Sequence, residues 1–287
     1  MANLKEIRAR ISSVGSTMQI TSAMKMVSAA KLKRAQDAIT QMRPYANKLR
    51  ELLVNLSSTL EGSSDGAFAQ EREVKKVLLV AITSNRGLCG AFNSNIIKKA
   101  KSLAENDFAD ADVSFLTIGK KGSEFFTKNG FTVRSSYDSL YDELTFENTS
   151  AIAEDIMQNF LSAEFDKVIL IYNQFKNAAT QLVQAEQFLP VEPPIEDGAT
   201  FGDYIFEPSQ EEIVTDLIPK SLKIQLYKGV LDSHASEHGA RMTAMHKATD
   251  NAGELKKDLT LTYNKARQAA ITGEILEIVG GAEALNG

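Results

Sequence analysis

The sequence predicts a fold in two parts: a long antiparallel coiled coil of two helices, one from each end of the chain, and a central α/β domain. Apolar residues recur at alternating spacings of three and four through both ends of the 287-residue chain, a pattern typical of helices that wind around a partner. Between these ends, short β-branched runs bounded by polar residues replace that pattern, as expected for strands.

The first helix is expected over residues 1–60. Its apolar seam begins at Leu4 and turns polar only at Thr21, Lys25 and Ser28. At ~1.5 Å per residue this helix spans roughly 85 Å, which is far beyond an ordinary globular helix. Because such a helix leaves a long apolar stripe in water, we expect a second helix to cover it.

The second helix is expected over residues 209–285, where the same spacing runs from Leu217 to Ala270. Each helix alone would expose its stripe, so the economical arrangement is an antiparallel pair formed by the two ends of the chain.

The central domain is expected over residues 74–190. Its runs "VKKVLLVAIT" and "FDKVILIYNQ" predict buried strands, and "VSFLTIG", "KKGSEFFTKNG" and "FTVRSS" predict a strand, a helix and a strand in succession. Its borders are the polar stretch 61–73 and the segment 189–210, which holds four of the six prolines. This order of elements indicates a Rossmann-like α/β domain.

Charge is distributed unevenly along the chain. Residues 1–60 contain ten Lys and Arg against three acidic residues, so their net charge is +7. The rest of the chain carries −12, which gives the net charge of −5. The first helix should therefore meet an acidic partner. Nucleic acid is disfavoured as that partner, because the segment has no recognition motif and only one aromatic residue, Tyr45.

The sequence disfavours membrane insertion, secretion and disulfide chemistry. Its longest apolar runs fall far short of the roughly 20 residues that a membrane span requires. The start "MANLKEIRAR" lacks the pattern of a secretory signal, so a cytoplasmic chain is expected. The single cysteine, Cys89, cannot form an internal disulfide or a usual cysteine metal site.

Two motifs lie where an α/β domain could bind a ligand. "TSNRGLCGAFNSN" follows a strand and precedes an expected helix, but it lacks the G-x-G-x-x-G spacing, and the chain has no G-x-x-x-x-G-K-[ST] loop. A nucleotide site stays open there as an alternative, whereas a structural turn, with or without a protein contact, is favoured. "GKKGS" is interpreted as a helix start.

Histidine placement gives no catalytic or metal site. His234 and His238 are four residues apart with Glu237 between them, a spacing that can bind a metal, but the order H-E-x-x-H is not matched. Solvation of a helix face or a partner contact is favoured instead. All three histidines lie between 234 and 246, and no nucleophile and base suggest themselves, so we expect no catalytic residue, metal or cofactor.

The stretch "MQITSAMKMVSAAK" is apolar on nearly every side, so a two-helix coil buries only part of it. Either a third helix of the same chain or a collar formed by a separate protein must cover the rest. The C-terminal stretch "AAITGEILEIVGGAEAL" favours the collar, because this apolar end has no positive charge after Arg267 and needs a socket.

Long segments of the chain resemble the gamma subunit of F-type ATP synthases. They are "KEIRARISSVGSTMQITSAMKMVSAAKLKRAQ", "RPYA", "SNRGLCGAFN", "DYIFEPS" and "SEHGARMTAMHKATDNAGELKKDLTLTYNKARQAAITGEILEIVGGAEAL". They stand at both ends and in the middle, in the family's order. The chain has neither a targeting extension nor the cysteine-bearing insert of the chloroplast form, so it resembles the bacterial type.

The resemblance implies a non-catalytic central-stalk rotor that couples proton flow through the membrane sector to ATP synthesis or hydrolysis at the beta subunits. Its implied partners are three alpha and three beta subunits, the epsilon subunit and the membrane proteolipid ring. It also implies a peripheral position at the cytoplasmic face of the bacterial cell membrane, without nucleic acid, cofactor or direct membrane insertion.

Family roles transfer onto matching positions. The resemblance implies beta-subunit contacts at five positions, namely Met24, Lys25, Arg241, Gln268 and Thr272, and proteolipid-ring contacts at Tyr204 and Glu207. Phe206 stands where some relatives carry a second tyrosine, so this chain lacks one hydroxyl group that contacts the ring in those relatives.

Two other classes of protein fit the sequence less well than the rotor. A Rossmann-like enzyme with a helical oligomerisation stalk is disfavoured by the missing phosphate-binding fingerprints and catalytic residues. A passive coiled-coil tether is disfavoured because it needs neither the apolar end nor the polar change in the seam.

Overall fold

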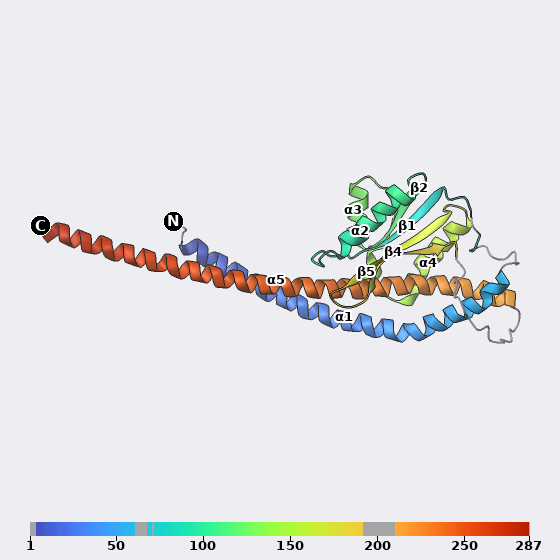
Figure 1. Ribbon diagram of the computed structural model, residues 1–287, viewed down its shortest axis with the longest axis horizontal. Helices are drawn as coiled ribbons and strands as arrows, with labels where there is room; N and C mark the ends of the chain where they lie inside the picture. The colour runs from blue at the N-terminus through green and yellow to red at the C-terminus, as the bar shows by residue number, and fades with distance from the viewer. Residues whose placement is uncertain (1–3, 61–67, 71, 192–209, 287) are drawn as a thin grey trace. The chain divides into compact units, whose positions relative to one another are not determined.

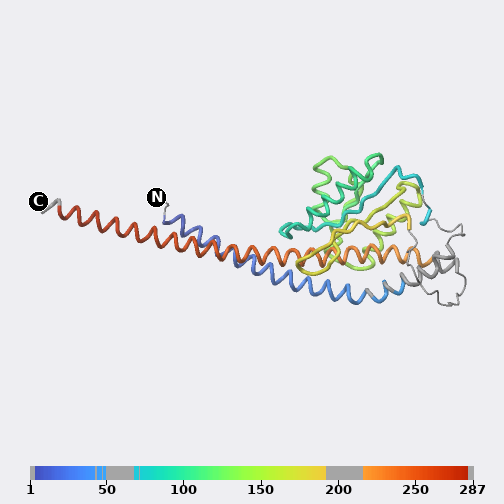
Figure 2. The backbone as a smooth tube through the Cα atoms, viewed as in Figure 1, coloured from blue at the N-terminus to red at the C-terminus, as the bar shows by residue number. Residues whose placement is uncertain are grey.

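The structure is a computed structural model, and it describes residues 4–60, 68–70, 72–191 and 210–286. Contacts within the chain divide it into two compact units. Unit 1 is Met1–Ser28 with Met242–Gly287, and unit 2 is Ala29–Arg241. Two long helices, α1 (Leu4–Leu60) and α5 (Gln210–Asn286), each contribute to both units (Figures 1 and 2).

Unit 1 is an antiparallel helix pair. Gly15 lies against Lys256, Met18 lies against Gly253, and the Thr249 hydroxyl donates to the Thr21 hydroxyl at 2.8 Å. Residue numbers therefore rise along α1 as they fall along α5. The seam predicted from the three-and-four spacing is the buried side of the pair.

The polar residues of the α1 seam do not interrupt it. Thr21 and Ser28 are both buried, and each hydroxyl donates to a carbonyl of its own helix, to Met18 O at 3.1 Å and to Met24 O at 2.7 Å. A small hydroxyl side chain whose donor is satisfied within the helix can pack in a seam. The expectation that the seam breaks at these two residues is corrected in this respect.

Unit 2 contains a five-stranded sheet in the order β3-β2-β1-β4-β5. The first four strands in this order pair in parallel, and β5 pairs antiparallel with β4. The strands are β1 (Lys76–Ile82), β2 (Asp112–Ile118), β3 (Val133–Ser136), β4 (Lys167–Phe175) and β5 (Gln181–Leu189). The centre of the sheet is buried on both faces, which explains the continuous apolar runs of β1 and β4.

Each face of the sheet has its own apolar core. Val77, Leu79 and Ala81 of β1 pack with α2 (Phe92–Ser102) and α3 (Lys120–Lys128). The alternate residues Leu78, Val80 and Ile82 pack on the opposite face with α4 (Phe146–Leu161) and with residues of α5. A π-helical turn, Leu103–Asp107, follows α2, and a 3₁₀ turn, Asp138–Tyr141, follows β3.

In unit 2 the helix α5 is covered on two opposite faces. Leu222, Leu226 and Val230 join the core beneath the sheet. On the other face the seam residues Leu231 and Ala235 are also buried, as are Leu32, Ala35 and Ile39 of α1. Lys31 of α1 is close enough to His234 of α5 to interact with it electrostatically, and Tyr45 is close enough to Lys220. The two helices are therefore antiparallel here as well.

The predicted fold class is confirmed, with long terminal helices that pair antiparallel and a central α/β domain. Strands β1 to β4 and the helices α2 and α3 stand where the sequence predicts them. The structure adds a helix, α4, and a strand, β5, that the sequence pattern does not predict. The alternation in "QLVQAEQFL" is largely polar, because β5 lies at an edge of the sheet and is only partly buried.

A glycine pair tests the packing between β1 and α3. Gly119 has φ +100°, and a Cβ there would lie 2.2 Å from the carbonyl oxygen of Thr83, whereas Gly130 has φ +78° with open space around it. We expect Gly130→Ala to lower the free energy of unfolding by about 1 kcal/mol from backbone strain alone. Gly119→Ala should lower it by roughly 3 kcal/mol or more, because backbone must also move.

Urea unfolding followed by near-ultraviolet circular dichroism measures this difference, because Tyr137, Tyr141 and Tyr172 lie in the domain. Equal losses for the two variants would contradict the close contact between Gly119 and Thr83.

Candidate functional site

The carboxyl end of β1 is where an open α/β sheet would normally bind its ligand. In this chain α5 and the loop 83–91 occupy that position. Cys89 and Phe92 pack with Ala240 of α5 in a small buried cluster. On β4, the Asn173 amide donates to Phe92 O at 3.2 Å, and the Asn173 carbonyl oxygen accepts from Ser236. The crevice is filled by the chain itself.

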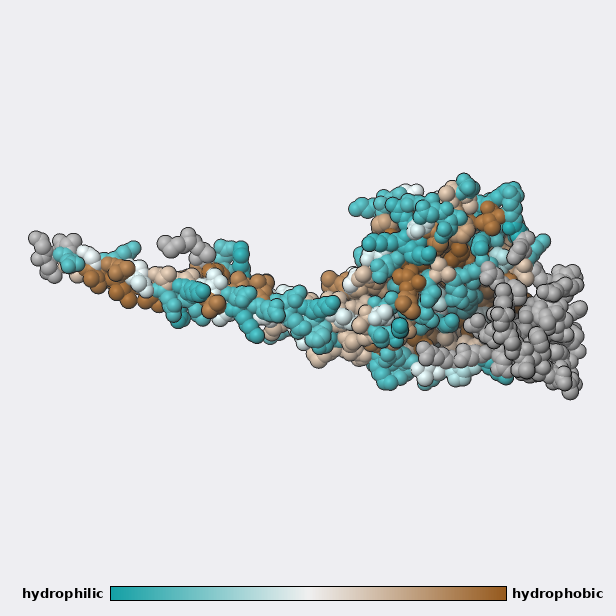
Figure 3. Space-filling view, viewed as in Figure 1, coloured by the Kyte–Doolittle hydropathy of each residue, from teal (hydrophilic) through white to brown (hydrophobic). Residues whose placement is uncertain are grey.

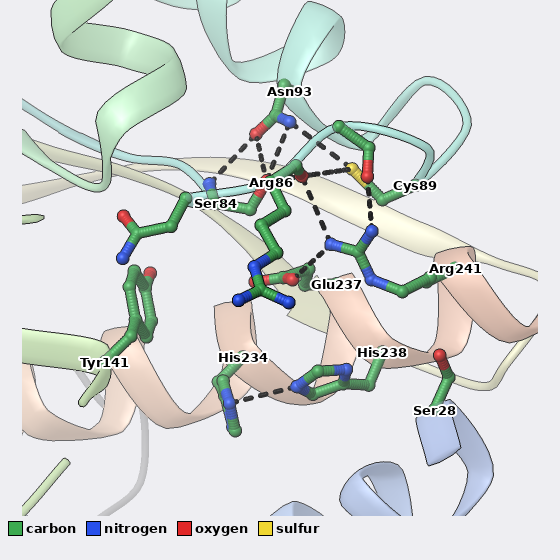
Figure 4. Close-up of polar contacts among 12 residues, drawn as sticks. Ser28, Ser84, Arg86, Cys89, Asn93, Tyr141, His234, Glu237, His238 and Arg241 are labelled. Atoms are coloured by element: carbon green, nitrogen blue, oxygen red, sulfur yellow. Dashed lines mark hydrogen bonds and ion pairs between the residues drawn. The ribbon is translucent and has the colours of Figure 1, made fainter. Parts of the chain in front are cut away.

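The loop 83–91 is held by its own polar groups and by Asn93 of α2 (Figure 4). The Ser84 backbone N–H donates to Asn93 Oδ1 at 2.9 Å, and the Ser84 hydroxyl donates to Arg86 O at 2.8 Å. The Asn93 amide donates to Ser84 Oγ and to Cys89 Sγ. Burial raises the pKa of the Cys89 thiol, so it remains protonated and unreactive at neutral pH. The interpretation of this motif as a structural turn agrees with these contacts.

Arg241 of α5 holds the loop 83–91 through hydrogen bonds to its carbonyl oxygens. Its guanidinium donates to the carbonyl oxygens of Gly87 and Arg86, the latter at 3.1 Å, and to the Glu237 carboxylate at 2.5 Å (Figure 4). Both charged side chains are buried, with about a tenth of each side chain exposed. Burial raises the pKa of Glu237, and the Arg241 charge opposes that shift.

The start of α3 offers no free donors to an anion. The N–H of Lys120 donates to Asn85 Oδ1, that of Lys121 to Ser84 O, and that of Gly122 to Thr83 Oγ1, all within 3.0 Å. A phosphate at this helix start would have to displace these acceptors. The interpretation of "GKKGS" as a helix start is confirmed.

His234 and His238 form a neutral pair, of which His238 is buried and His234 half-buried. Their Nε2 atoms are 3.1 Å apart, so one ring donates to the other, and Tyr141 stacks on His234. Burial lowers the pKa of His234 to about 4, with a smaller contribution from the Lys31 charge. Burial also lowers the pKa of His238 to about 3, and the charges of His234, Lys31 and Arg241 act in the same direction. Both rings are therefore neutral at pH 7.

The described part of the chain has no group of three or more metal-ligating side chains. The alternative of a metal pair at His234 and His238 therefore has no further ligand of that kind within those residues. The sequence suggested solvation of this helix face, but His238 is buried and His234 is half-buried beneath the Tyr141 ring.

The predicted beta-subunit contacts lie in different places. Met24 and Lys25 are half-buried in α1 of unit 1, whereas Gln268 and Thr272 are exposed on α5 of the same unit. Arg241 belongs to unit 2 and is only 7% exposed. Tyr204 and Glu207 lie outside the described residues.

Unit 1 exposes many large apolar side chains. On α1, Ile20, Met26 and Val27 are each more than half exposed. On α5 the last turns expose a continuous apolar set, namely Ile271, Ile275, Leu276, Ile278 and Val279. Hydrophobic residues are visible along this end of α5 in Figure 3. Within the described residues of unit 1 no third helix covers these side chains.

Known proteins resemble this chain over its whole length. A family model described as ATP synthase matches residues 3–285. The ATP synthase gamma chain of Flavobacterium johnsoniae is 69% identical, and that of Christiangramia forsetii is 63% identical, each over 100% of both chains. The chain belongs to the ATP synthase gamma chain family.

Solved structures share the fold. A chain from a structure described as central stalk and c-ring of the Tetrahymena thermophila mitochondrial ATP synthase is 28% identical, with a TM-score of 0.59. The match covers 80% of this chain and 99% of the Tetrahymena chain. A chain from the Euglena gracilis mitochondrial ATP synthase has a TM-score of 0.69 at 22% identity, and the match covers 98% of this chain and 94% of the Euglena chain. At this identity the likeness supports the fold alone. As a family member, the chain serves ATP synthase as a non-catalytic rotor subunit.

Among the described residues, no helix is both long and apolar enough to cross a bilayer.

The lowered pKa values of His234 and His238 predict acid sensitivity of unit 2. The unfolded chain protonates each histidine near pH 6.5, whereas the folded chain does so only near pH 4 and pH 3. Between these values the unfolded state binds more protons, so the free energy of unfolding falls as pH falls, by up to about 1.4 kcal/mol per pH unit for each histidine. The raised pKa of Glu237 acts in the opposite direction and remains in both proteins compared below.

His238→Gln isolates this contribution. Urea unfolding near pH 7 and near pH 5 should show that the parent chain loses more stability than the variant, by about 2 kcal/mol. The same loss in both proteins would show that His238 is not held neutral by the fold.

Proposed function

We propose that this chain is the rotating shaft that couples proton flow through the membrane sector to ATP synthesis and hydrolysis at the beta subunits. The observation that supports this most is the exposed apolar surface of unit 1. Several hundred Å² of contiguous apolar surface in a soluble protein marks a contact site. A surrounding sleeve of three alpha and three beta subunits would cover it.

Contacts to the beta subunits would be polar as well as apolar. Met24 and Lys25 stand beside the exposed residues of α1, and a lysine there suits an acidic loop. Gln268 and Thr272 present hydrogen-bonding side chains on the exposed end of α5. Arg241 would meet a beta-subunit loop through the N–H donors that its bonds to Arg86 and Gly87 leave over, or after those bonds break.

Coupling would follow from unequal contacts. A two-helix shaft has different side chains on each side, so three surrounding beta subunits face different surfaces at any one angle. A partner changes conformation only to the extent that its contacts differ between states, and rotation of the shaft supplies that difference.

The other end of the shaft would rest on the proteolipid ring through Tyr204 and Glu207, with the epsilon subunit beside it. The structural relative from Tetrahymena, described as central stalk and c-ring, supports the ring as a partner. The chain would be a peripheral subunit at the cytoplasmic face of the bacterial cell membrane. Its working parts would be the helices 1–60 and 209–285 and the domain 74–190.

Reconstitution tests the proposal. Alpha and beta subunits of the same source are mixed with this chain, and the complex is isolated by gel filtration and assayed for ATP hydrolysis. We expect one copy of this chain in a complex that hydrolyses ATP much faster than the separate components. A chain that stays unbound, or a complex with unchanged turnover, would contradict the rotor and favour the passive tether.

Met24→Lys should impair coupling, because it adds a charge where α1 would face the sleeve. Inverted membrane vesicles that contain the whole ATP synthase allow proton pumping to be divided by ATP hydrolysed. We expect this ratio to fall at least roughly two-fold. A contact weakened by about 0.5 kcal/mol or more would let uncoupled turnover compete with coupled turnover to that extent. Thr40→Lys adds the same charge at an exposed position of α1 in unit 2 and should leave the ratio unchanged.

Removing Gln268 and Thr272 together should slow ATP hydrolysis by the reconstituted complex. Each lost hydrogen bond is worth about 0.5–1.5 kcal/mol, which corresponds to a roughly two- to ten-fold lower rate of ATP hydrolysis. The matched control is Thr260→Ala with Asn264→Ala, an exposed threonine and amide at the same spacing on the same helix. Equal rates for the two double variants would remove Gln268 and Thr272 from the contact.

A further inference from the structure

The sheet domain is attached to α5 along one face of that helix. Gln225, Gly229, Ser233, Ser236 and Ala240 recur at spacings of three and four, so they share one side of α5. This side lies opposite the seam that faces α1 in unit 2. The stretch 229–241 is buried at every position except the half-buried His234.

Small residues bring the helix close to the sheet. A Cβ on Gly229 would lie 3.5 Å from the Tyr172 ring, and a Cβ on Gly239 would lie 3.2 Å from Ala178 Cα, at the turn between β4 and β5. The ~1 kcal/mol cost of each glycine within a helix is offset where such contact is needed. The domain therefore touches α5 backbone to backbone, not only through long side chains.

Among the polar side chains of α5 that bond to the domain, Gln225, Ser236 and Arg241 do so at different positions along the helix axis. The Gln225 amide donates to Glu186 Oε1 at 2.9 Å and to Gln187 O at 3.0 Å. The Ser236 hydroxyl donates to Asn173 O at 2.9 Å, and Arg241 donates to the carbonyl oxygens of the loop 83–91. From residue 225 to 241 these bonds extend over roughly 24 Å of helix.

The acceptors are themselves fixed. Glu186 also accepts from the Tyr172 hydroxyl at 2.7 Å, which ties strand β5 to β4 beneath the amide of Gln225. Asn173 and Gln187 offer main-chain oxygens of the paired strands β4 and β5. A donor on α5 therefore meets acceptors that belong to the rigid sheet.

Apolar contacts and hydrogen bonds constrain this junction differently. Burial of Leu222, Leu226 and Val230 holds the domain on the helix, but the hydrophobic effect has no direction and resists a small turn only weakly. A hydrogen bond weakens steeply when its angle changes. Donors spread along the helix axis therefore resist rotation of the domain about α5.

We propose that Gln225, Ser236 and Arg241 are positioning residues that fix the angle of the sheet domain about α5 and transmit torque between them. The inference rests on the proposed rotor function and specifies where the torque enters the shaft. Apolar packing supplies the attachment, and these bonds supply its torsional stiffness.

The test measures angular fluctuations in the complex of this chain with alpha and beta subunits, immobilised and stalled without ATP. A bead is attached through Lys128→Cys on the exposed end of α3, which reports the domain. In a second preparation it is attached through Lys220→Cys, an exposed position on α5 itself. The native Cys89 is buried with a raised pKa, so the introduced thiol reacts first.

Gln225→Leu combined with Ser236→Ala removes three of these hydrogen bonds and leaves Arg241, a proposed beta-subunit contact, untouched. We expect the angular variance of the bead on the domain to rise at least two-fold, and that of the bead on α5 to stay unchanged. A matched control, Ile96→Val in the core on the far face of the sheet, should leave both variances unchanged.

The outcomes separate the two proposals. A parent complex that fails to form or to turn with ATP overturns the proposed function and this inference with it. A parent complex that turns, with equal variance on the domain in parent and double variant, overturns this inference alone. A variance that rises equally at both attachment points also overturns it, because the added flexibility then lies within the shaft.

Discussion

Helix α5 between residues 222 and 241 is covered on two opposite faces, and the rest of unit 2 depends on that constraint. One face packs beneath the sheet with Leu226 and Val230, and the other carries the seam that pairs with α1. A surface helix needs only one apolar stripe, whereas a helix covered on both sides is buried nearly all round. The burial explains why the polar residues of this stretch bond within the chain, as Glu237 does with Arg241.

The same constraint explains why a Rossmann-like sheet is used here as a support. The carboxyl end of β1 would be a ligand crevice in a related enzyme fold. In this chain Arg241 donates to the loop that follows β1, and Ser236 donates to β4. A buried ion pair such as Arg241 with Glu237 adds little net stability, because desolvation offsets its attraction. Its value is directional, since it fixes the loop and the helix in one arrangement.

Sequence reasoning could find the features that repeat locally. The three-and-four spacing from Leu4 onward and the apolar runs of β1 and β4 are set by neighbours along the chain, and the structure confirms both. The exposed apolar end of α5 could be inferred because the seam there is accompanied by further apolar residues. The burial of Thr21 could not, because a hydroxyl in a seam resembles a break until its own-helix acceptor is known. Gln225 and Glu186 are 39 residues apart, and no local pattern links them.

Observation of rotation tests the central claim most directly. The complex of this chain with alpha and beta subunits is immobilised through the beta subunits, and a bead on the sheet domain is followed under the microscope. The rotor predicts that the bead turns continuously in one direction when ATP is added and stops when ATP is exhausted. A bead that stays at a fixed angle while the same complex hydrolyses ATP would contradict the account.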